Sequence, residues 1–254
     1  MYQKRFDTLL NFIKAKGNVK IKELNALFPE YNEMTIRRDL ITLEKIGYIV
    51  RTHGGAKINE EILSPKFSHS KRIITYREEK ERIGKCALEF IKKNSSIYLD
   101  SGSTVLQMVK NFPDIPIFVL TNSPLFAWEL ATKKNVEVVL TGGSLNKQVF
   151  SLSGPIAQYS LDRINIDLAF FGAAGYSDTH GFTNALYNEC ELKKKAFSVA
   201  KEKIMLIDSS KDGKILPYTF AEYKDINTLI TDKEPSKQQA ESLNKNGVNV
   251  IIAK

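Results

Sequence analysis

The amino-acid sequence predicts an α/β protein in two parts, an N-terminal winged helix-turn-helix followed by a mainly parallel α/β domain. Apolar residues recur at helical spacing through residues 6–46, and a short alternating segment with two glycines follows. Beyond residue 73, short apolar runs alternate with helical patterns. These observations divide the 254 residues into a winged helix-turn-helix at 1–57, a linker at 58–72 and an α/β domain at 73–254.

The first part contains three predicted helices and a hairpin. The helices are expected at residues 6–16, 22–28 and 33–46. Asn32 offers a side-chain oxygen that caps the third helix. A strand at 48–52, a turn at His53-Gly54-Gly55 and a returning strand at 56–58 then form the wing. Three helices followed by a hairpin are typical of a winged helix-turn-helix.

The outward face of the third helix carries groups that bind DNA in other proteins. Ile36, Leu40 and Leu43 share one face, whereas Met34 and Arg38 point the opposite way. An arginine forks onto guanine or holds phosphate, and a threonine meets a base edge, a methyl group or a phosphate. The residues expected at DNA are Asn32, Met34, Thr35, Arg37, Arg38, Arg51, His53 and Lys57. The alternative is a small helical domain with solvated arginines.

The distribution of charge agrees with a nucleic-acid partner for the first part. The whole chain has a net charge of +8, and residues 1–57 hold eleven basic and six acidic residues, a net charge of +5. The composition is ordinary for a globular protein, and no apolar run is long enough to span a membrane. Cys86 and Cys190 stand far apart, which predicts two thiols in a reducing cytoplasm.

The second part alternates strands with helices, as parallel sheets require. The expected strands are 96–99, 117–120, 136–140, 168–171, 204–207, 228–230 and 248–252. The expected helices are 76–92, 104–110, 124–133, 184–201 and 236–246. We therefore predict one largely parallel sheet that is covered by helices.

The loops after the strands are rich in Gly, Ser, Thr and Asn. They are Asp100–Thr104, Thr121–Pro124, Thr141–Ser144, Gly172–Gly175 and Asp208–Lys211. The carboxyl ends of parallel strands are where open α/β sheets bind ligands. Lys211 adds a positive charge, and Asp100 or Asp208 can accept hydrogen bonds from hydroxyl groups, which favours a phosphorylated sugar or polyol as ligand. For any single loop a simple turn is the commoner explanation.

Two blocks in the first part carry a resemblance to a known family. Thr35-Ile36-Arg37-Arg38-Asp39-Leu40 and Arg51-Thr52-His53-Gly54-Gly55-Ala56 resemble the signature of DeoR-type bacterial transcriptional regulators. The turn Phe28–Asn32 departs from that family's pattern, with Asn32 as the substitute cap. The loops of the second part resemble the DeoR-type effector domain, although Ser103 stands where the family has threonine. The resemblance implies a fold related to ribose-5-phosphate isomerase and coenzyme A transferases.

The resemblance also implies where an effector binds. Arg72 and Lys80 match basic positions that the family uses against a phosphorylated effector, whereas Glu191-Leu192-Lys193 matches a pattern for which we expect only charge on the helix surface. The expected effector-binding residues are Arg72, Lys80, Asp100, Ser101, Gly102, Ser103, Thr104, Thr121, Asn122, Ser123, Gly142, Gly143, Asp208 and Lys211.

The sequence thus predicts a ligand-responsive transcriptional regulator, a repressor of sugar-metabolism genes relieved by a phosphorylated sugar. We expect it to bind double-stranded DNA as a homodimer or homotetramer in the cytoplasm, with no membrane partner, no cofactor and no metal. The alternative is a sugar-phosphate isomerase-like enzyme with an accessory DNA-binding module, in which Asp100 or Asp208 acts as base and Lys211 stabilises an enediolate. None of the three histidines stands in an acid–base motif, which favours binding without turnover.

Overall fold

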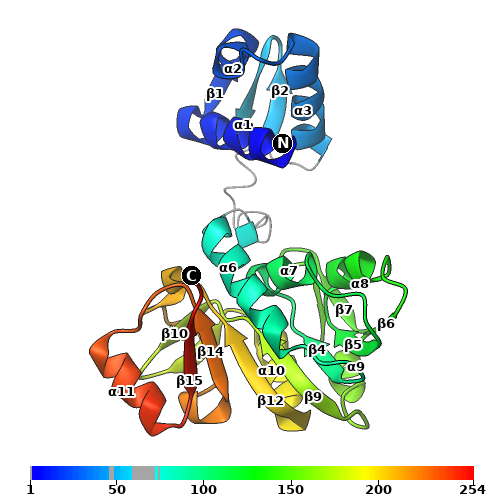
Figure 1. Ribbon diagram of the computed structural model, residues 1–254, viewed down its shortest axis with the longest axis vertical. Helices are drawn as coiled ribbons and strands as arrows, with labels where there is room; N and C mark the ends of the chain where they lie inside the picture. The colour runs from blue at the N-terminus through cyan, green and yellow to red at the C-terminus, as the bar shows by residue number, and fades with distance from the viewer. Residues whose placement is uncertain (1, 46–48, 59–71, 74) are drawn as a thin grey trace. The chain divides into compact units, whose positions relative to one another are not determined.

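The computed structural model describes residues 2–45, 49–58, 72–73 and 75–254, which form two compact units (Figure 1). The units comprise residues 1–71 and 72–254. Most of the predicted linker, 58–72, lies outside the described residues. Its two ends differ from the prediction, because Ile58 still belongs to a strand and Arg72 belongs to the second unit.

The first unit has the predicted three helices and hairpin. Its elements are α1 (Tyr2–Lys16), β1 (Asn18–Lys20), α2 (Ile21–Leu27), α3 (Glu33–Lys45), β2 (Ile49–Thr52) and β3 (Gly55–Ile58). The predicted helix-turn-helix and hairpin are therefore present, and β1 completes an antiparallel sheet in the order β1-β3-β2. Gly55 permits this pairing, because a Cβ there would lie 2.0 Å from the carbonyl oxygen of Val19.

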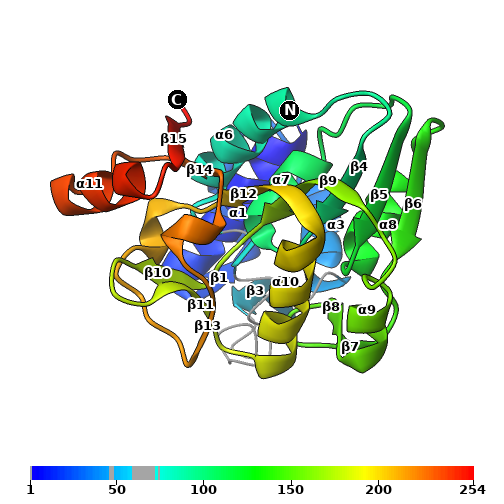
Figure 2. The same cartoon turned by 90° about the horizontal axis from the view of Figure 1, so that it is seen from below.

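The second unit is built on a seven-stranded sheet whose neighbouring strands are all parallel (Figures 1 and 2). The strands are β4 (Ser96–Leu99), β5 (Ile117–Thr121), β6 (Val136–Leu140), β9 (Ile166–Phe171), β12 (Ala200–Leu206), β14 (Thr228–Thr231) and β15 (Asn249–Ile252). Each of the seven predicted strands overlaps one of them, so the predicted fold class is confirmed.

Helices cover both faces of this sheet, and α6 and α10 lie on opposite sides of it (Figure 2). One face packs against α6 (Arg77–Ala87), α7 (Ser103–Val109) and α8 (Pro124–Leu130). The other packs against α9 (Pro155–Tyr159), α10 (Tyr187–Val199) and α11 (Lys237–Lys245). Alternate residues of a strand therefore enter different cores, as Phe170 and Phe171 of β9 do.

The strand order β15-β14-β12-β9-β4-β5-β6 reverses direction between β4 and β9. The connection after β4 passes through α7 on one face, and the connection after β9 reaches α10 on the other. Neighbouring strands whose connections leave on opposite faces open a crevice at their carboxyl ends, which is the usual ligand position in open α/β sheets. The fold therefore places its crevice between residues 100–103 and 172–174.

Several short elements escaped prediction. They are β7 (Ser144–Asn146), β8 (Ser151–Ser153), α9, β10 (Gly175–Ser177), β11 (Gly181–Asn184), β13 (Tyr218–Ala221) and the 3-10 turns Leu88–Phe90, Ser209–Lys211 and Tyr223–Asp225. Strands β10, β11 and β13 form an antiparallel sheet, and β7 pairs with β8. The predicted helix 184–201 is too long at both ends, since Asn184 closes β11 and Ala200 begins β12. Within the described residues, no helix is long and apolar enough to cross a membrane.

We expect Phe171→Ala to lower the stability of the second unit by about 3–5 kcal/mol, because truncating a buried aromatic side chain leaves a cavity. Phe171 is fully buried and packs between Phe197 and Tyr98, with ring centroids 4.1 and 5.6 Å away. Urea unfolding followed by circular dichroism measures the change. Tyr159→Ala, at a residue 72% exposed, is the control and is expected to change stability by less than about 0.5 kcal/mol. Equal effects of the two variants would contradict the packing described here.

Candidate functional site

The first unit exposes the predicted DNA-binding residues along α3 and the wing. Asn32 caps α3 by accepting hydrogen bonds from the backbone N–H and the hydroxyl of Thr35, both at 2.9 Å. Met34 is 61% exposed, and the remaining predicted residues Arg37, Arg38, Arg51, His53 and Lys57 are exposed as well. Ile36, on the opposite face of α3, is fully buried, as the helical spacing predicts.

A buried carboxylate on the inward face of α3 fixes the position of this helix. Asp39 of α3 is 2% exposed and accepts hydrogen bonds from Nε and Nη2 of Arg5, at 2.6 and 3.2 Å. The guanidinium of Arg5 also lies over the ring of Tyr31, 4.3 Å from its centroid. This contact links α1 to α3 and to the turn before α3, so the outward face of α3 has a defined orientation.

In the second unit, a pocket lies at the crevice between β4 and β9. Its walls come from the loops after these two strands, from α10, from the β7–β8 hairpin and from the first residue of the unit. The lining residues are Arg72, Ser101, Gly102, Ser103, Thr104, Val149, Gly172, Ala173, Ala174, Asn184, Glu189, Lys193 and Lys211. Six of the predicted effector residues therefore meet in one pocket, namely Arg72, Ser101, Gly102, Ser103, Thr104 and Lys211.

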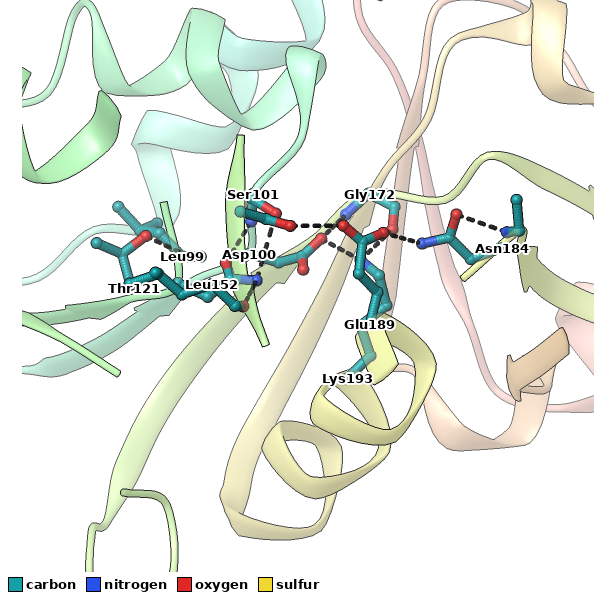
Figure 3. A network of polar contacts seen from close by, with 12 residues as sticks. Leu99, Asp100, Ser101, Thr121, Leu152, Gly172, Asn184, Glu189 and Lys193 are labelled. Atoms are coloured by element: carbon teal, nitrogen blue, oxygen red, sulfur yellow. Dashed lines mark hydrogen bonds and ion pairs between the residues drawn. The ribbon is translucent and has the colours of Figure 1, made fainter. Parts of the chain in front are cut away.

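A buried ion pair joins Lys193, which lines the pocket, to Asp100 (Figure 3). Lys193 of α10 donates a short hydrogen bond to Oδ2 of Asp100 and a second, at 3.0 Å, to the carbonyl oxygen of Gly172. The same Asp100 oxygen accepts the backbone N–H of Gly172 at 3.2 Å. Lys193 is 4% exposed, so the expectation of simple helix-surface charge at residues 191–193 is wrong for this residue.

The predicted residues 121–123, at the carboxyl end of β5, lie next to the loop that begins at Ser101 (Figure 3). Asn122 accepts the backbone N–H of Ser101 at 2.7 Å and donates to its hydroxyl at 3.3 Å. Thr121 donates to the carbonyl oxygen of Leu99 at 2.7 Å, and Ser123 caps α8 through Phe126. All three side chains are buried, but only Asn122 holds the Ser101 loop, and none of the three lines the pocket.

Glu189 is a pocket residue that the sequence reasoning missed. One of its carboxylate oxygens accepts from the hydroxyl of Ser151 at 2.6 Å, and the other accepts from the amide of Asn184 at 2.9 Å (Figure 3). Glu189 and Lys193 stand four residues apart, so both point from one face of α10 into the same site. That spacing is the signal by which they could have been found.

Lys80 and Asp208 lie next to the pocket without lining it. Both are buried, and Lys80 Nζ is 3.8 Å from Asp208 Oδ2. Lys80 Nζ also donates to the backbone carbonyl oxygens of Arg72 and Thr75, at 2.6 and 2.5 Å. In this structure the ammonium group of Lys80 is therefore engaged by the backbone that carries Arg72, and contact with an effector stays a prediction.

Gly142 and Gly143 belong to a turn that the structure explains without a ligand. Both have positive φ, at 69° and 100°, and a Cβ on Gly143 would lie 2.6 Å from the carbonyl oxygen of Ser153. They connect β6 to β7 and do not line the pocket described above. For this loop the simple turn is the better explanation.

Burial changes the acid–base properties of the cations around the pocket. Desolvation lowers the pKa of Lys211 and that of Arg72, although the carboxylates of Asp208, Glu189 and Asp100 oppose this effect. An anionic ligand stabilises a desolvated cation, because its negative charge compensates for the lost solvation by water. The pocket therefore has the chemistry of an anion site with hydroxyl, amide and carboxylate groups beside it.

Comparisons with known proteins agree with this division into two units. Residues 5–62 match the family model of the DeoR-like helix-turn-helix domain, and residues 75–233 match that of the DeoR C-terminal sensor domain. The HTH-type transcriptional repressor GlcR of Bacillus subtilis is 34% identical over 99% of this chain and 97% of its own length. The L-fucose operon activator of Haemophilus influenzae is 31% identical over 90% and 91%. A solved ribose-5-phosphate isomerase A from Methanocaldococcus jannaschii, 19% identical, aligns with 54% of this chain and 55% of its own, at a TM-score of 0.41.

The buried Lys80 predicts a pH dependence of stability. Desolvation lowers its pKa from 10.5 to about 8 in the folded protein. Between these values the unfolded chain binds a proton that the folded chain has released, so stability rises with pH across the window. We expect the free energy of unfolding of the wild type, relative to that of Lys80→Met, to increase as the pH rises from 8 toward 10.5.

Urea unfolding at a series of pH values measures this difference. Lys233→Met, which removes an exposed lysine, is the control and should keep the rise seen in the wild type. Parallel pH profiles for wild type and Lys80→Met would show that Lys80 keeps its ordinary pKa.

Proposed function

Because the chain belongs to the DeoR family of transcriptional regulators, we propose that it is a sequence-specific repressor whose second unit binds a phosphorylated sugar. The observation that carries the proposal is the pocket at the reversal of strand order, where Arg72, Lys211 and a hydroxyl-rich loop meet. The relatives include a protein named as a repressor and one named as an activator. We choose repression because the relative with the higher identity of the two is the repressor.

The pocket divides into a part suited to phosphate and a part suited to sugar hydroxyls. Arg72 and Lys211 supply positive charge, and the loop from Ser101 to Thr104 supplies hydroxyl groups, which donate hydrogen bonds to phosphate oxygens. Glu189 and Asn184 line the same pocket with groups that pair with hydroxyls. A ligand with one anionic end and several hydroxyls uses both parts.

The same geometry favours binding over catalysis. An isomerase needs a carboxylate that is available to remove a proton from carbon. Asp100, the candidate base at the end of β4, is buried and already bound by the ammonium group of Lys193 and by the Gly172 N–H. Incubation with ribose 5-phosphate tests this point, and isomer conversion well above the uncatalysed background would favour the enzyme alternative.

We infer that the ligand signal leaves the pocket through Arg72. This residue lines the pocket and is the first residue of the second unit, so in the sequence it directly follows the segment that joins the two units. Lys80 fixes the carbonyl groups of Arg72 and Thr75 at the same place. A ligand that binds the Arg72 side chain therefore acts on the residue at which the second unit begins. A coupling free energy of about 1–3 kcal/mol between ligand binding and DNA binding is enough for derepression.

At the DNA end, we propose that Thr35, Arg37 and Arg38 enter the major groove while Arg51 and His53 hold the flanking backbone. A homodimer or homotetramer presents two such helices to half-sites one or more helical turns apart. A regulator of this kind acts on DNA in the cytoplasm.

Arg38→Ala is expected to weaken operator binding by about 1–3 kcal/mol and to relax base preference at one position, because an arginine in the major groove reads guanine. Fluorescence anisotropy with a duplex selected by the wild type, and with single-base variants of it, measures both effects. An equal loss of affinity for every duplex would instead identify a phosphate contact at Arg38.

A panel of sugar phosphates is expected to contain at least one compound that raises the melting temperature of the protein, because a ligand bound only by the folded state stabilises it. Lys211→Met should abolish that shift, since it removes a cation from the pocket wall. Lys233→Met, away from the pocket, should preserve it. No shift with any compound, or a shift that survives Lys211→Met, would contradict the proposed ligand site.

A further inference from the structure

Two of the arginines that the sequence assigns to DNA are held by carboxylates in the first unit. Arg37 on α3 pairs with Glu33, one turn earlier on the same helix. Arg51 on β2 pairs with Glu44, near the end of α3. Arg38, the neighbouring exposed arginine, makes no side-chain hydrogen bond or ion pair among the described residues. The pairing is therefore selective and not a general consequence of crowded surface charge.

The Arg37 pair is anchored from a second helix. Glu33 Oε1 accepts from Nε of Arg37 at 2.8 Å and lies 2.6 Å from Nη2. The other oxygen of Glu33 accepts from the side-chain amide of Asn25 on α2 at 3.0 Å. Glu33 is thus fixed between α2 and α3, the two helices of the helix-turn-helix. Three of the five N–H groups of Arg37 stay outside this contact and remain for a base.

The Arg51 pair joins the wing to the recognition helix. Glu44 Oε2 accepts from Nε of Arg51 at 2.6 Å, and Glu44 Oε1 accepts from the backbone N–H of Arg51 at 2.9 Å. Both carboxylate oxygens therefore bind the same residue, so side chain and backbone are positioned together. Four N–H groups of the guanidinium remain.

A carboxylate beside an arginine has opposite effects on two kinds of DNA binding. Binding to random DNA depends on neutralising phosphates, and a guanidinium already neutralised by a carboxylate contributes little to it. Base reading depends on the direction of the remaining N–H groups, which a fixed guanidinium presents at a smaller loss of side-chain entropy. The pair therefore lowers the affinity for random DNA more than the affinity for an operator.

We propose that Glu33 and Glu44 are specificity-determining residues that withhold Arg37 and Arg51 from the phosphates of random DNA while orienting them for an operator. The inference rests on the proposed function, since it presumes that this surface binds DNA. The two glutamates act through the arginines and are positioning residues with no DNA contact of their own.

The test uses the full-length protein with two duplexes of equal length and composition. One is the duplex enriched by the wild type from a random pool, and the other is its scrambled version. Dissociation constants are measured over a series of salt concentrations for the wild type, Glu33→Gln and Glu44→Gln. Glu23→Gln is the matched control, because Glu23 pairs with Lys16 at 2.6 Å and its replacement adds the same unit of charge to the same unit of the protein.

For Glu33→Gln we expect the affinity for the scrambled duplex to rise several-fold and its salt slope to steepen by about 0.9, the value of one additional phosphate contact. The affinity for the selected duplex should change less, so that the ratio of the two affinities falls. Glu44→Gln should act in the same direction, and Glu23→Gln should leave the ratio unchanged. Thermal melts of the variants confirm that each is folded.

Three results would overturn the inference. Equal shifts of both duplexes in Glu33→Gln and Glu23→Gln would show only an effect of net charge. A loss of affinity for the selected duplex alone would show that Glu33 contacts a base itself. Failure of the wild type to enrich any duplex would overturn the proposed function and the inference with it. The first two results, in contrast, leave the proposed function intact.

Discussion

The pocket of the second unit depends on the ion pair between Asp100 and Lys193. Asp100 stands at the end of β4, Lys193 on α10, and both bind the backbone of Gly172 at the end of β9. One contact therefore fixes the two loops between which the strand order reverses, together with the helix that covers them. Removing one partner of such a buried pair costs about 3–5 kcal/mol, because the other charge stays buried without compensation.

The first unit uses the same solution on a smaller scale. Asp39 lies on the buried face of α3, and Arg5 of α1 supplies its counter-charge. In both units a carboxylate at the base of a functional surface is paired by a cation from a distant element. These ion pairs therefore hold the backbone that carries the side chains proposed to bind DNA and effector.

The sequence was sufficient for the framework because the framework is periodic. Each strand of the parallel sheet contains a short run of apolar residues, and the central strands β4 and β9 contribute to the cores on both faces. Strands such as β10, with the sequence Gly-Tyr-Ser, are only three residues long and carry no alternating pattern. Their pairing is decided by tertiary contacts, and short-range patterns do not contain that information.

The site was only partly predictable for a related reason. Loop composition located Ser101–Thr104 and Lys211, because glycine and hydroxyl residues after a strand are visible in the sequence. Lys193 was missed because a lysine in a helix is normally solvated, and only the fold shows that α10 turns this one inward. The sequence placed Lys80 near the pocket, but it could not show that its ammonium group binds backbone carbonyl oxygens there.

The balance of charge around the pocket supports the anionic ligand proposed above. Lys193 is neutralised by Asp100, and Lys80 lies beside Asp208, so neither pair leaves net charge. Of the charged groups that line the pocket, Arg72 and Lys211 exceed Glu189 by one positive charge. An anionic ligand, as proposed above, therefore gains more from this pocket than a neutral sugar does. The proposed preference for phosphate thus rests on the two internal ion pairs as well as on the residues that line the pocket.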